Sequence, residues 1–369
     1  NDGTLKAGAK VLYITAKTAK TVSTTVNTGK QETITGLQSI IDAYSKGKDK
    51  TPIAFRIIGK VSLSDLDHIS SSAEGLQVKG ATMNMTFEGV GDDATVYGFG
   101  FLLREAVSVE FRNFAIMRCL DDAMSLDTKN SNVWIHNMDL FYGKKGSAAD
   151  QAKGDGTVDI KGDSKYVTVA YNRFWDNGKA SMCGMKSETG ENWITYHHNW
   201  FDHSDSRMAR VRTMSVHMYN NYYQHCDVYG IGATSGSSVF MESNYFDATK
   251  RPIMSSLQGT DAKGDGTFSG EKGGLIKAYG NVFANKPDNF SYIPYAENNT
   301  SFDAYEVSAP SEQVPSSVKT LVGGTSYNNF DTNSSLMYAY AADKAEDVPA
   351  IVEGFYGAGR LNHGDIDFV

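Results

Sequence analysis

The sequence predicts an all-β protein, a right-handed parallel β-helix (a solenoid), and three observations lead to this fold class. A short strand-like segment recurs along the chain. These segments are rich in β-branched and aromatic residues, and glycine or asparagine bounds them. No helical pattern of crossover length separates them, which argues against a doubly wound α/β fold. A strand unit that repeats at this length is the signature of a solenoid.

The recurring segment has an apolar first residue, an asparagine at the sixth place and an aromatic residue at the eighth. Five segments fit this template, and they begin at Val167, Ile194, Val216, Val239 and Ile276. Their asparagines are Asn172, Asn199, Asn221, Asn244 and Asn281. The intervals between these asparagines are 27, 22, 23 and 37 residues, and two longer intervals along the repeat indicate insertions.

Weaker versions of the template begin at Val109 and Val133, with Asn113 and Asn137 one place earlier. Asparagine suits a turn of a β-helix because it tolerates the left-handed backbone conformation and its amide can bond the neighbouring coil. We therefore interpret the asparagines as a structural stack and assign them no chemistry.

Both ends of a solenoid need a cover, because an open coil exposes core and strand edges. Residues Thr35–Gln38 fit a capping box, followed by the amphipathic run Leu37, Ile40, Ile41 and Tyr44, which predicts a short N-terminal capping helix. After Asn281 the template fades. We expect one domain over residues 1–369, with a repeat core of about 50–285. The tail, 286–369, should form long loops and a short helix packed on the outside.

The composition agrees with a turn-rich globular chain, since it has 36 Gly, only 7 Pro and 40% hydrophobic residues. No apolar run approaches the ~20 residues of a transmembrane helix. The first residues lack the apolar core of a signal peptide, so we expect a secreted protein whose signal peptide has been removed. Cys119, Cys183 and Cys226 match no disulfide framework. We expect buried free thiols, with one disulfide left open.

Three arginines, Arg207, Arg210 and Arg212, lie within six residues of one another in a chain of net charge −8. Such a concentration of like charge requires something anionic opposite it. Asp155 and Asp159 are four residues apart, so both side chains point to the same face of an extended segment. With Asp122, one or two coils earlier, they could supply oxygen ligands for Ca²⁺. These aspartates could equally serve turns.

These motifs resemble those of the family 1 polysaccharide lyases, the pectate lyases, which fold as parallel β-helices. The motifs are VWI at 133–135, DGTVDIKG at 155–162, and HHNWF at 197–201 followed by RMARVR at 207–212. The resemblance runs from about Thr35 to Asn285. It implies that Arg207 is the catalytic base and that Lys179 and Arg212 hold the developing charge. Lys161 is the matching lysine of the DIKG run. We expect Lys161, Lys179, Arg212 and Arg210 to bind substrate.

The resemblance also implies that Asp122, Asp155 and Asp159 are the Ca²⁺ ligands. The chain departs from the family's pattern at Leu120, where some members have a further acidic ligand, although Asp121 stands beside it.

The implied reaction is Ca²⁺-dependent β-elimination, which cleaves α-1,4-linked polygalacturonate and gives 4,5-unsaturated oligogalacturonides. The alternative is a pectin lyase acting on methyl-esterified chains, but such relatives disrupt the aspartate cluster with a basic residue. A β-helical glycoside hydrolase could use Asp121 and Asp122 as an acid pair, yet its GHG and RIK motifs are absent. A non-catalytic glycan-binding β-helix is the remaining alternative. We expect a monomer, with no nucleic-acid and no membrane partner.

Overall fold

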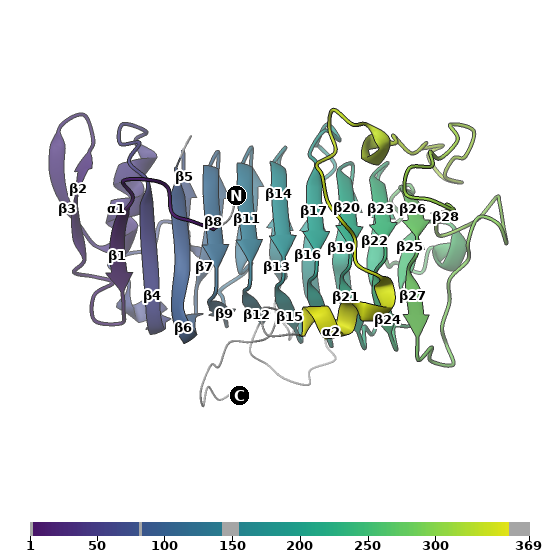
Figure 1. The fold of residues 1–369 in the computed structure, drawn as a ribbon, viewed down its shortest axis with the longest axis horizontal. Coiled ribbons are helices and arrows are strands. Elements are labelled where there is room, and N and C mark those ends of the chain that lie inside the picture. Colours follow the sequence, from purple (N-terminus) through teal and green to yellow (C-terminus); the bar gives the residue numbers. More distant parts are fainter. Residues whose placement is uncertain (1–2, 81–82, 142–154, 354–369) are drawn as a thin grey trace.

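The computed structural model describes residues 3–80, 83–141 and 155–353, in which the chain winds into a right-handed parallel β-helix (Figure 1). One parallel sheet has eight strands, one from each of eight successive coils. They are β5 (Gly75–Lys79), β7 (Gly100–Arg104), β10 (Met124–Thr128), β13 (Gly156–Ile160), β16 (Lys179–Cys183), β19 (Ser206–Arg212), β22 (Ile231–Thr234) and β25 (Ile253–Ser255).

A second, eighteen-stranded sheet forms the remaining walls of the coils. Its N-terminal strands are β1 (Lys10–Ile14), β4 (Ile53–Ser62), β6 (Met85–Tyr97), β8 (Val107–Arg112), β9 (Ala115–Met117), β11 (Ser131–His136), β12 (Asp139–Phe141), β14 (Lys165–Ala170) and β15 (Arg173–Trp175). The others are β17 (Ile194–His197), β18 (Trp200–Asp202), β20 (Ser215–Tyr219), β21 (Tyr222–Gln224), β23 (Ser238–Glu242), β24 (Tyr245–Asp247), β26 (Leu275–Tyr279), β27 (Val282–Ala284) and β28 (Tyr305–Glu306).

The predicted template is confirmed in the strand register. Val167, Ile194, Val216, Val239 and Ile276 are direct partners on successive parallel strands. Each coil therefore repeats the one before it, and identical positions stack along the axis. This pairing begins before residue 50, because β1 already pairs in parallel with β4.

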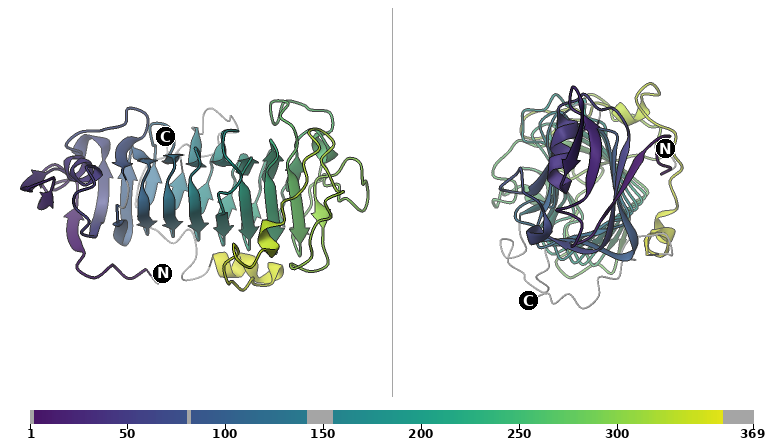
Figure 2. Two further views of the ribbon diagram at one scale, coloured as in Figure 1. Left: turned by 90° about the horizontal axis from the view of Figure 1, so that it is seen from above. Right: turned by 90° about the vertical axis from the view of Figure 1, so that its left-hand side faces the viewer.

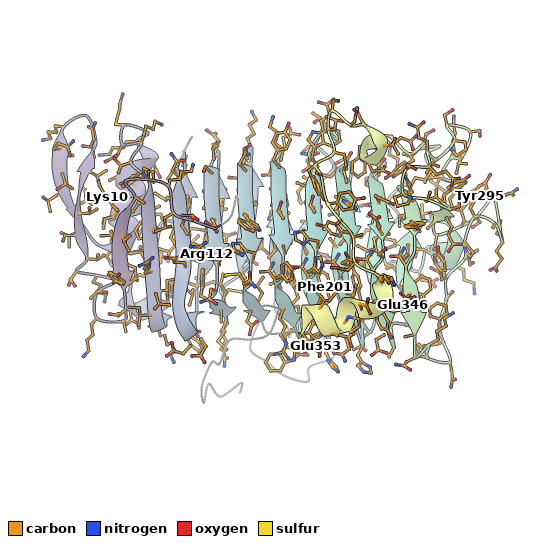
Figure 3. The ribbon with its side chains drawn as sticks, in the orientation of Figure 1. Lys10, Arg112, Phe201, Tyr295, Glu346 and Glu353 are labelled. Carbon is orange, nitrogen blue, oxygen red and sulfur yellow. The ribbon has the colours of Figure 1, made fainter. Side chains whose placement is uncertain are left out.

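Stacked aromatic rings fill the interior at the eighth place of the template. The ring centroids of Phe174 and Phe201 are 4.8 Å apart, those of Phe201 and Tyr223 are 4.9 Å apart, and those of Tyr223 and Phe246 are 4.3 Å apart. Phe201 lies midway along the array (Figure 3). The ring spacing follows the strand spacing of about 4.8 Å, so the aromatic stack and the sheets support the same geometry.

The asparagine stack is also confirmed. Asn221 accepts hydrogen bonds at Oδ1 from the main-chain N–H (3.1 Å) and the side-chain amide (2.9 Å) of Asn199. Its own amide donates to the carbonyl of Tyr196 (3.0 Å) and to Oδ1 of Asn244 (3.0 Å). The same bonds continue to Asn172 and Asn281. The stack thus satisfies buried turn groups on every coil it crosses.

We expected the left-handed backbone conformation at the stacked asparagines. The structure has it one residue before them. Tyr171, His198 and Asn220 have φ of 55°, 54° and 51°. Asn113 and Asn137 (φ 59° and 52°) belong to this row, which explains why they stand one place earlier in the sequence. The side chain that stacks and the residue that turns the chain are therefore neighbours with separate tasks.

The predicted N-terminal helix is present as α1 (Leu37–Ser45), at the N-terminal end of the array (Figure 1). Its residues Leu37, Ile40, Ile41 and Tyr44 are buried, as expected. The capping box was wrong: the helix begins after Gly36 without a side-chain cap from Thr35. Thr35 lies in strand β3 and its hydroxyl bonds Ser23.

The N–H groups of the first turn of α1 are satisfied from elsewhere in the chain. The carboxylate of Asp67 accepts from the N–H of Gln38 (2.9 Å) and of Ser39 (3.1 Å). A Cβ at Gly36 would lie 2.4 Å from this carboxylate, so only glycine fits there. The β2–β3 hairpin (Ser23–Asn27 and Gln31–Thr35) extends beyond the helix.

The described part of the C-terminal tail runs back along the outside of the eighteen-stranded sheet, and residues 354–369 of the predicted tail lie outside the described residues (Figures 1 and 2). This part includes α2 (Val348–Val352), which buries Val348 and Val352 against Tyr222. Glu346 and Glu353 lie at the two ends of this helix (Figure 3). The described residues also include the 3₁₀ turns Leu63–Asp65, Gly259–Asp261, Phe330–Thr332 and Ala345–Asp347.

All three cysteines are buried free thiols, as predicted. Among the described helices, none is both long enough and apolar enough to cross a membrane.

We predict that Asn221→Ala lowers the free energy of unfolding by about 2–4 kcal/mol, because it leaves buried groups on two neighbouring coils without partners. Denaturant titration measures this. The exposed Asn299 is the matched control, and Asn299→Ala should change stability by less than about 0.5 kcal/mol. Equal stability of the two variants would remove Asn221 from the stabilising network.

Candidate active site

Charged side chains gather on the outward face of the eight-stranded sheet, where strands β10, β13, β16 and β19 lie side by side. In the strand register Gly156 pairs with Lys179, and Lys179 pairs with Ser206. Asp155, Lys179 and Arg207 therefore lie at or next to the beginnings of three adjacent strands. Residues separated by more than fifty positions in the sequence are thus brought together by the repeat.

An acidic group stands at one side of this row. Asp121, Asp122 and Asp155 each offer a carboxylate oxygen, and these oxygens all lie within 4.8 Å of one another. Asp122 is only 4% exposed, whereas Asp155 is exposed. Three carboxylates at this separation can share one hard cation such as Ca²⁺. The structure therefore brings Asp122 and Asp155 together as expected, and adds Asp121.

Asp159 lies beside this group rather than within it. Its Oδ1 accepts from the N–H of Met182 (3.1 Å), while the ammonium of Lys161 lies 3.8 Å from its Oδ2 and 3.1 Å from Oδ2 of Asp122. Gly156 makes room for Asp159, because a Cβ at Gly156 would be 2.5 Å from its Oδ1. The glycine of the DGTVD run is thus required by the carboxylate three residues later.

The carboxylates outnumber the cations that neutralise them. Burial, and then the charge of Asp159, raise the pKa of Asp122 to about 8, although Lys161 opposes this. Burial likewise raises the pKa of Asp159, against the charges of Lys161 and Arg207. Buried carboxylates whose ionised form is disfavoured gain most from an added positive charge. The donor set, which is all oxygen, and this charge deficit fit a Ca²⁺ ion.

Glu271 is the anion opposite the arginine cluster, and sequence reasoning missed it. Nε of Arg212 lies 3.0 and 2.9 Å from its two carboxylate oxygens, and an Nη of Arg210 lies 3.1 Å away. Lys186 adds a third cation at 3.0 Å, and Thr234 donates at 2.7 Å. Glu271 lies in the 37-residue interval of the repeat, and that insertion was the only sequence signal for it.

Despite its burial, hydrogen bonds from Arg212, Thr234 and Lys186 hold the pKa of Glu271 well below its usual range. Arg210 is 4% exposed and also donates to the carbonyl of Phe268 (3.0 Å), so its guanidinium is enclosed by the protein. Arg212 is held at the rim by the same carboxylate.

Arg207 differs from its two neighbours. It is half-buried and has a left-handed φ of 60° within strand β19. Among the described residues, its guanidinium has no hydrogen-bond or ion-pair partner. Lys179, on the adjacent strand, has its ammonium 3.3 Å from Oδ1 of Asp155. Arg207 therefore has a guanidinium without a partner among the described residues. Its strand lies next to that of Lys179, whose ammonium contacts Asp155 of the acidic group.

The fold and the site together define a class of protein. It is a parallel β-helix that carries acidic and basic side chains side by side on one sheet. Residues 3–327 match the family described as "Pectate lyase", and the chain belongs to that family.

Curated relatives carry the same family name. A pectate trisaccharide-lyase of Bacillus licheniformis is 28% identical over 62% of this chain, and the match covers 65% of the relative, just under two thirds. Pectate lyase C of Dickeya chrysanthemi is 25% identical over 96% of this chain and 88% of its own.

Solved structures share the fold. A pectate lyase from Bacillus sp. N165 in complex with trigalacturonate has a TM-score of 0.64 and 22% identity, over 96% of this chain and 95% of that one. Pectate lyase C from Erwinia chrysanthemi, with Ca²⁺, has a TM-score of 0.62 and 22% identity, over 98% and 95% of the two chains.

We predict that Glu271→Gln lowers the free energy of unfolding by about 3–5 kcal/mol at neutral pH, because it leaves buried guanidiniums without their counter-charge. The folded-state pKa of Glu271 lies below the ordinary 4.5, so the difference from wild type should be complete above that pH. It should then shrink as the pH falls toward the folded-state pKa.

Denaturant titrations at several pH values measure this difference, and the exposed Glu297→Gln is the control. A stability gap that does not depend on pH would show that the charge of Glu271 is not the stabilising feature.

Proposed function

We propose that this protein is a pectate lyase that cleaves α-1,4-linked polygalacturonate by Ca²⁺-dependent β-elimination. One observation carries the proposal: the uncommitted guanidinium of Arg207 stands near an acidic group (Asp121, Asp122 and Asp155) with Lys179 between their strands. Family membership supports it, as do two solved structures of the same fold, one in complex with trigalacturonate and one with Ca²⁺.

The chemistry of the substrate explains why both charges are needed. The proton on C5 of a galacturonate lies α to a carboxylate, so its removal creates a second negative charge on the same group. Ca²⁺ held by Asp121, Asp122 and Asp155 would neutralise the uronate carboxylate and make this proton more acidic. Fixed cations stabilise such a charge best where water is scarce.

Each basic residue has a separate task in the proposed reaction. Arg207 takes the proton from C5, the C4–C5 double bond forms, and the C4–O bond breaks. The leaving oxygen then takes a proton from water. Lys179 and Arg212 bind the uronate carboxylate while it carries extra charge. Glu271 holds Arg212 in position for this task. Arg210 is enclosed by the protein and pairs with the carboxylate of Glu271, so it does not contact substrate.

A base role for arginine needs explanation, because arginine is normally protonated. Anionic partners would stabilise the charged form, and cationic neighbours disfavour it. Arg207 donates no hydrogen bond to a carboxylate among the described residues, and Lys179 on the adjacent strand pairs with Ser206, the residue before Arg207. Lys161, between Asp122 and Asp159, partly compensates the charge of those carboxylates, and we expect it to bind substrate.

A pectin lyase remains the second candidate, but it acts without metal and would have no use for the acidic group. Because polygalacturonate is a polymer too large to enter a cell, we propose that the enzyme is secreted. We also propose that it acts as a monomer.

We predict that cleavage of polygalacturonate stops when Ca²⁺ is chelated and returns when Ca²⁺ is added. Asp155→Ala should raise the Ca²⁺ concentration needed for half-maximal activity by about tenfold or more, with an unchanged melting temperature, because Asp155 is exposed. Absorbance of the unsaturated product measures both effects. Asp265→Ala, at another exposed aspartate, is the control. Full activity after exhaustive chelation would contradict the proposal.

We predict that Arg207→Lys lowers kcat by about 10²–10⁴, the usual contribution of a positioned proton-transfer group. KM and the Ca²⁺ requirement should change little, because lysine retains the positive charge. If Arg207 only bound substrate, the variant would instead raise KM and retain kcat. Arg104→Lys, on strand β7 of the same sheet, is the matched control. Wild-type turnover by Arg207→Lys would assign the base to another residue, Lys179 first.

A further inference from the structure

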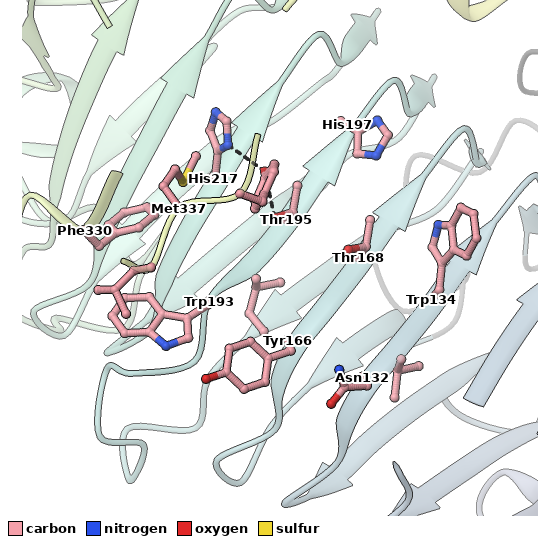
Figure 4. A pocket seen from close by; sticks show the side chains of 14 residues that line it. Asn132, Trp134, Tyr166, Thr168, Trp193, Thr195, His197, His217, Phe330 and Met337 are labelled. Atoms are coloured by element: carbon pink, nitrogen blue, oxygen red, sulfur yellow. Dashed lines mark hydrogen bonds between the residues drawn. The ribbon is translucent and has the colours of Figure 1, made fainter. Parts of the chain in front are cut away.

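A second concave site lies on the eighteen-stranded sheet, away from the charged row. It is a groove of about 490 Å³ on the outer face of β11, β14, β17 and β20, and the C-terminal tail forms its other wall (Figure 4). Tyr338 of the tail fixes that wall, because its hydroxyl lies 2.9 Å from the hydroxyl of Thr195 and 2.8 Å from Nδ1 of His217. The groove is therefore preformed, and its volume is that of an ordinary ligand site.

Aromatic rings from three successive coils form the floor. Trp134 lies at one end, Tyr166 follows on the next coil, and Trp193 lies on the coil after that, beside Phe330 (Figure 4). Successive coils are separated by about 4.8 Å, so the two tryptophans are displaced by about 10 Å along the axis. The strand partner of Trp134 on the coil of Trp193 is Thr195, so Trp193 is also displaced by two residues, about 7 Å, along the strand. An extended glycan that contacts both rings would therefore cross the coils obliquely. Tyr166 is 49% exposed, and Leu336 on the facing wall is 41% exposed.

Polar groups that could bind hydroxyls stand between the rings. The indole N–H groups of Trp134 and Trp193, the hydroxyl of Thr168 and the side-chain amide N–H of Asn132 donate to no described residue. Thr168 is the direct strand neighbour of Trp134, and Asn132 lies two residues before it. Aromatic faces with a few polar groups among them are the usual lining of a site that orients a small uncharged ligand.

The lining contains no Lys, Arg, Asp or Glu among its described residues. Its histidines do not add charge at neutral pH, since burial, followed by the charges of neighbouring histidines, lowers the pKa of His197 to about 3. A polyuronate would bring one carboxylate per sugar into this groove with no cation to receive it. The charged row on the eight-stranded sheet has the opposite character.

We propose that this groove binds a neutral, extended glycan, a β-1,4-linked hexose or pentose chain whose flat ring faces stack on Trp134 and Trp193. Hydroxyl groups of the chain accept from the indole N–H groups and from Asn132. No Asp, Glu, Lys or Arg stands among the described lining residues, and we assign the groove binding without catalysis. It does not depend on the proposed lyase activity.

Isothermal titration with cellohexaose and xylohexaose, with trigalacturonate as the charged comparison, tests the proposal. Wild type should bind at least one neutral hexasaccharide, and Trp134→Ala and Trp193→Ala should each weaken that binding by about tenfold or more. Tyr13→Ala, at an aromatic residue 52% exposed on β1, is the matched control and should bind as wild type does. Activity on soluble polygalacturonate should be the same in all four proteins.

Three results would overturn the proposal. One is a wild type that binds neither neutral hexasaccharide, and another is unchanged affinity in both tryptophan variants. The third is a concentration-dependent dimer in sedimentation that Trp134→Ala abolishes, which would assign the groove to a second copy of this chain. If the wild-type protein binds the neutral glycan but does not cleave polygalacturonate, only the proposed function is contradicted.

Discussion

Hydrogen bonding between successive coils sets every other dimension of this molecule. The parallel strands fix a spacing of about 4.8 Å, and each stacked position must then hold side chains that tolerate this distance from their own kind. Aromatic rings do so by stacking, and asparagines do so by exchanging hydrogen bonds. Charged residues of one sign do not, which confines them to the outward face, where ions of the other sign can be interleaved.

This constraint explains the chemistry of the outward face. The same stacking that places Phe201 over Phe174 places Lys179 beside Asp155 and next to the strand of Arg207. The register of the sheet sets the separation of Lys179 and Arg207, whereas Asp121, Asp122 and Asp155 lie in the turns just before β10 and β13. The hydrogen bonds between the parallel strands therefore set the positions of the side chains on these strands.

The fold was predictable because it depends on local repetition. The asparagine and aromatic places of the template and the apolar face of α1 follow from spacing, whereas the grouping of Asp122 with Asp155 was implied by the resemblance to the pectate lyases. What could not be predicted depends on contacts between distant segments. Asp67 caps α1 from another part of the chain, Glu271 neutralises Arg210 and Arg212 from an insertion, and Asp159 turns to Lys161 and the Met182 N–H. No periodicity encodes such partners.

The insertion that carries Glu271 has a consequence for how this chain can change in length. A coil tolerates extra residues at a turn, because the strands on either side still pair with their neighbours. This segment is an exception. Shortening it to the length of an ordinary coil would remove the carboxylate of Glu271 and leave the guanidiniums of Arg210 and Arg212 without their counter-charge. Length variation at the other turns is therefore permissive, whereas here the loop and the arginines can only be gained or lost as a unit.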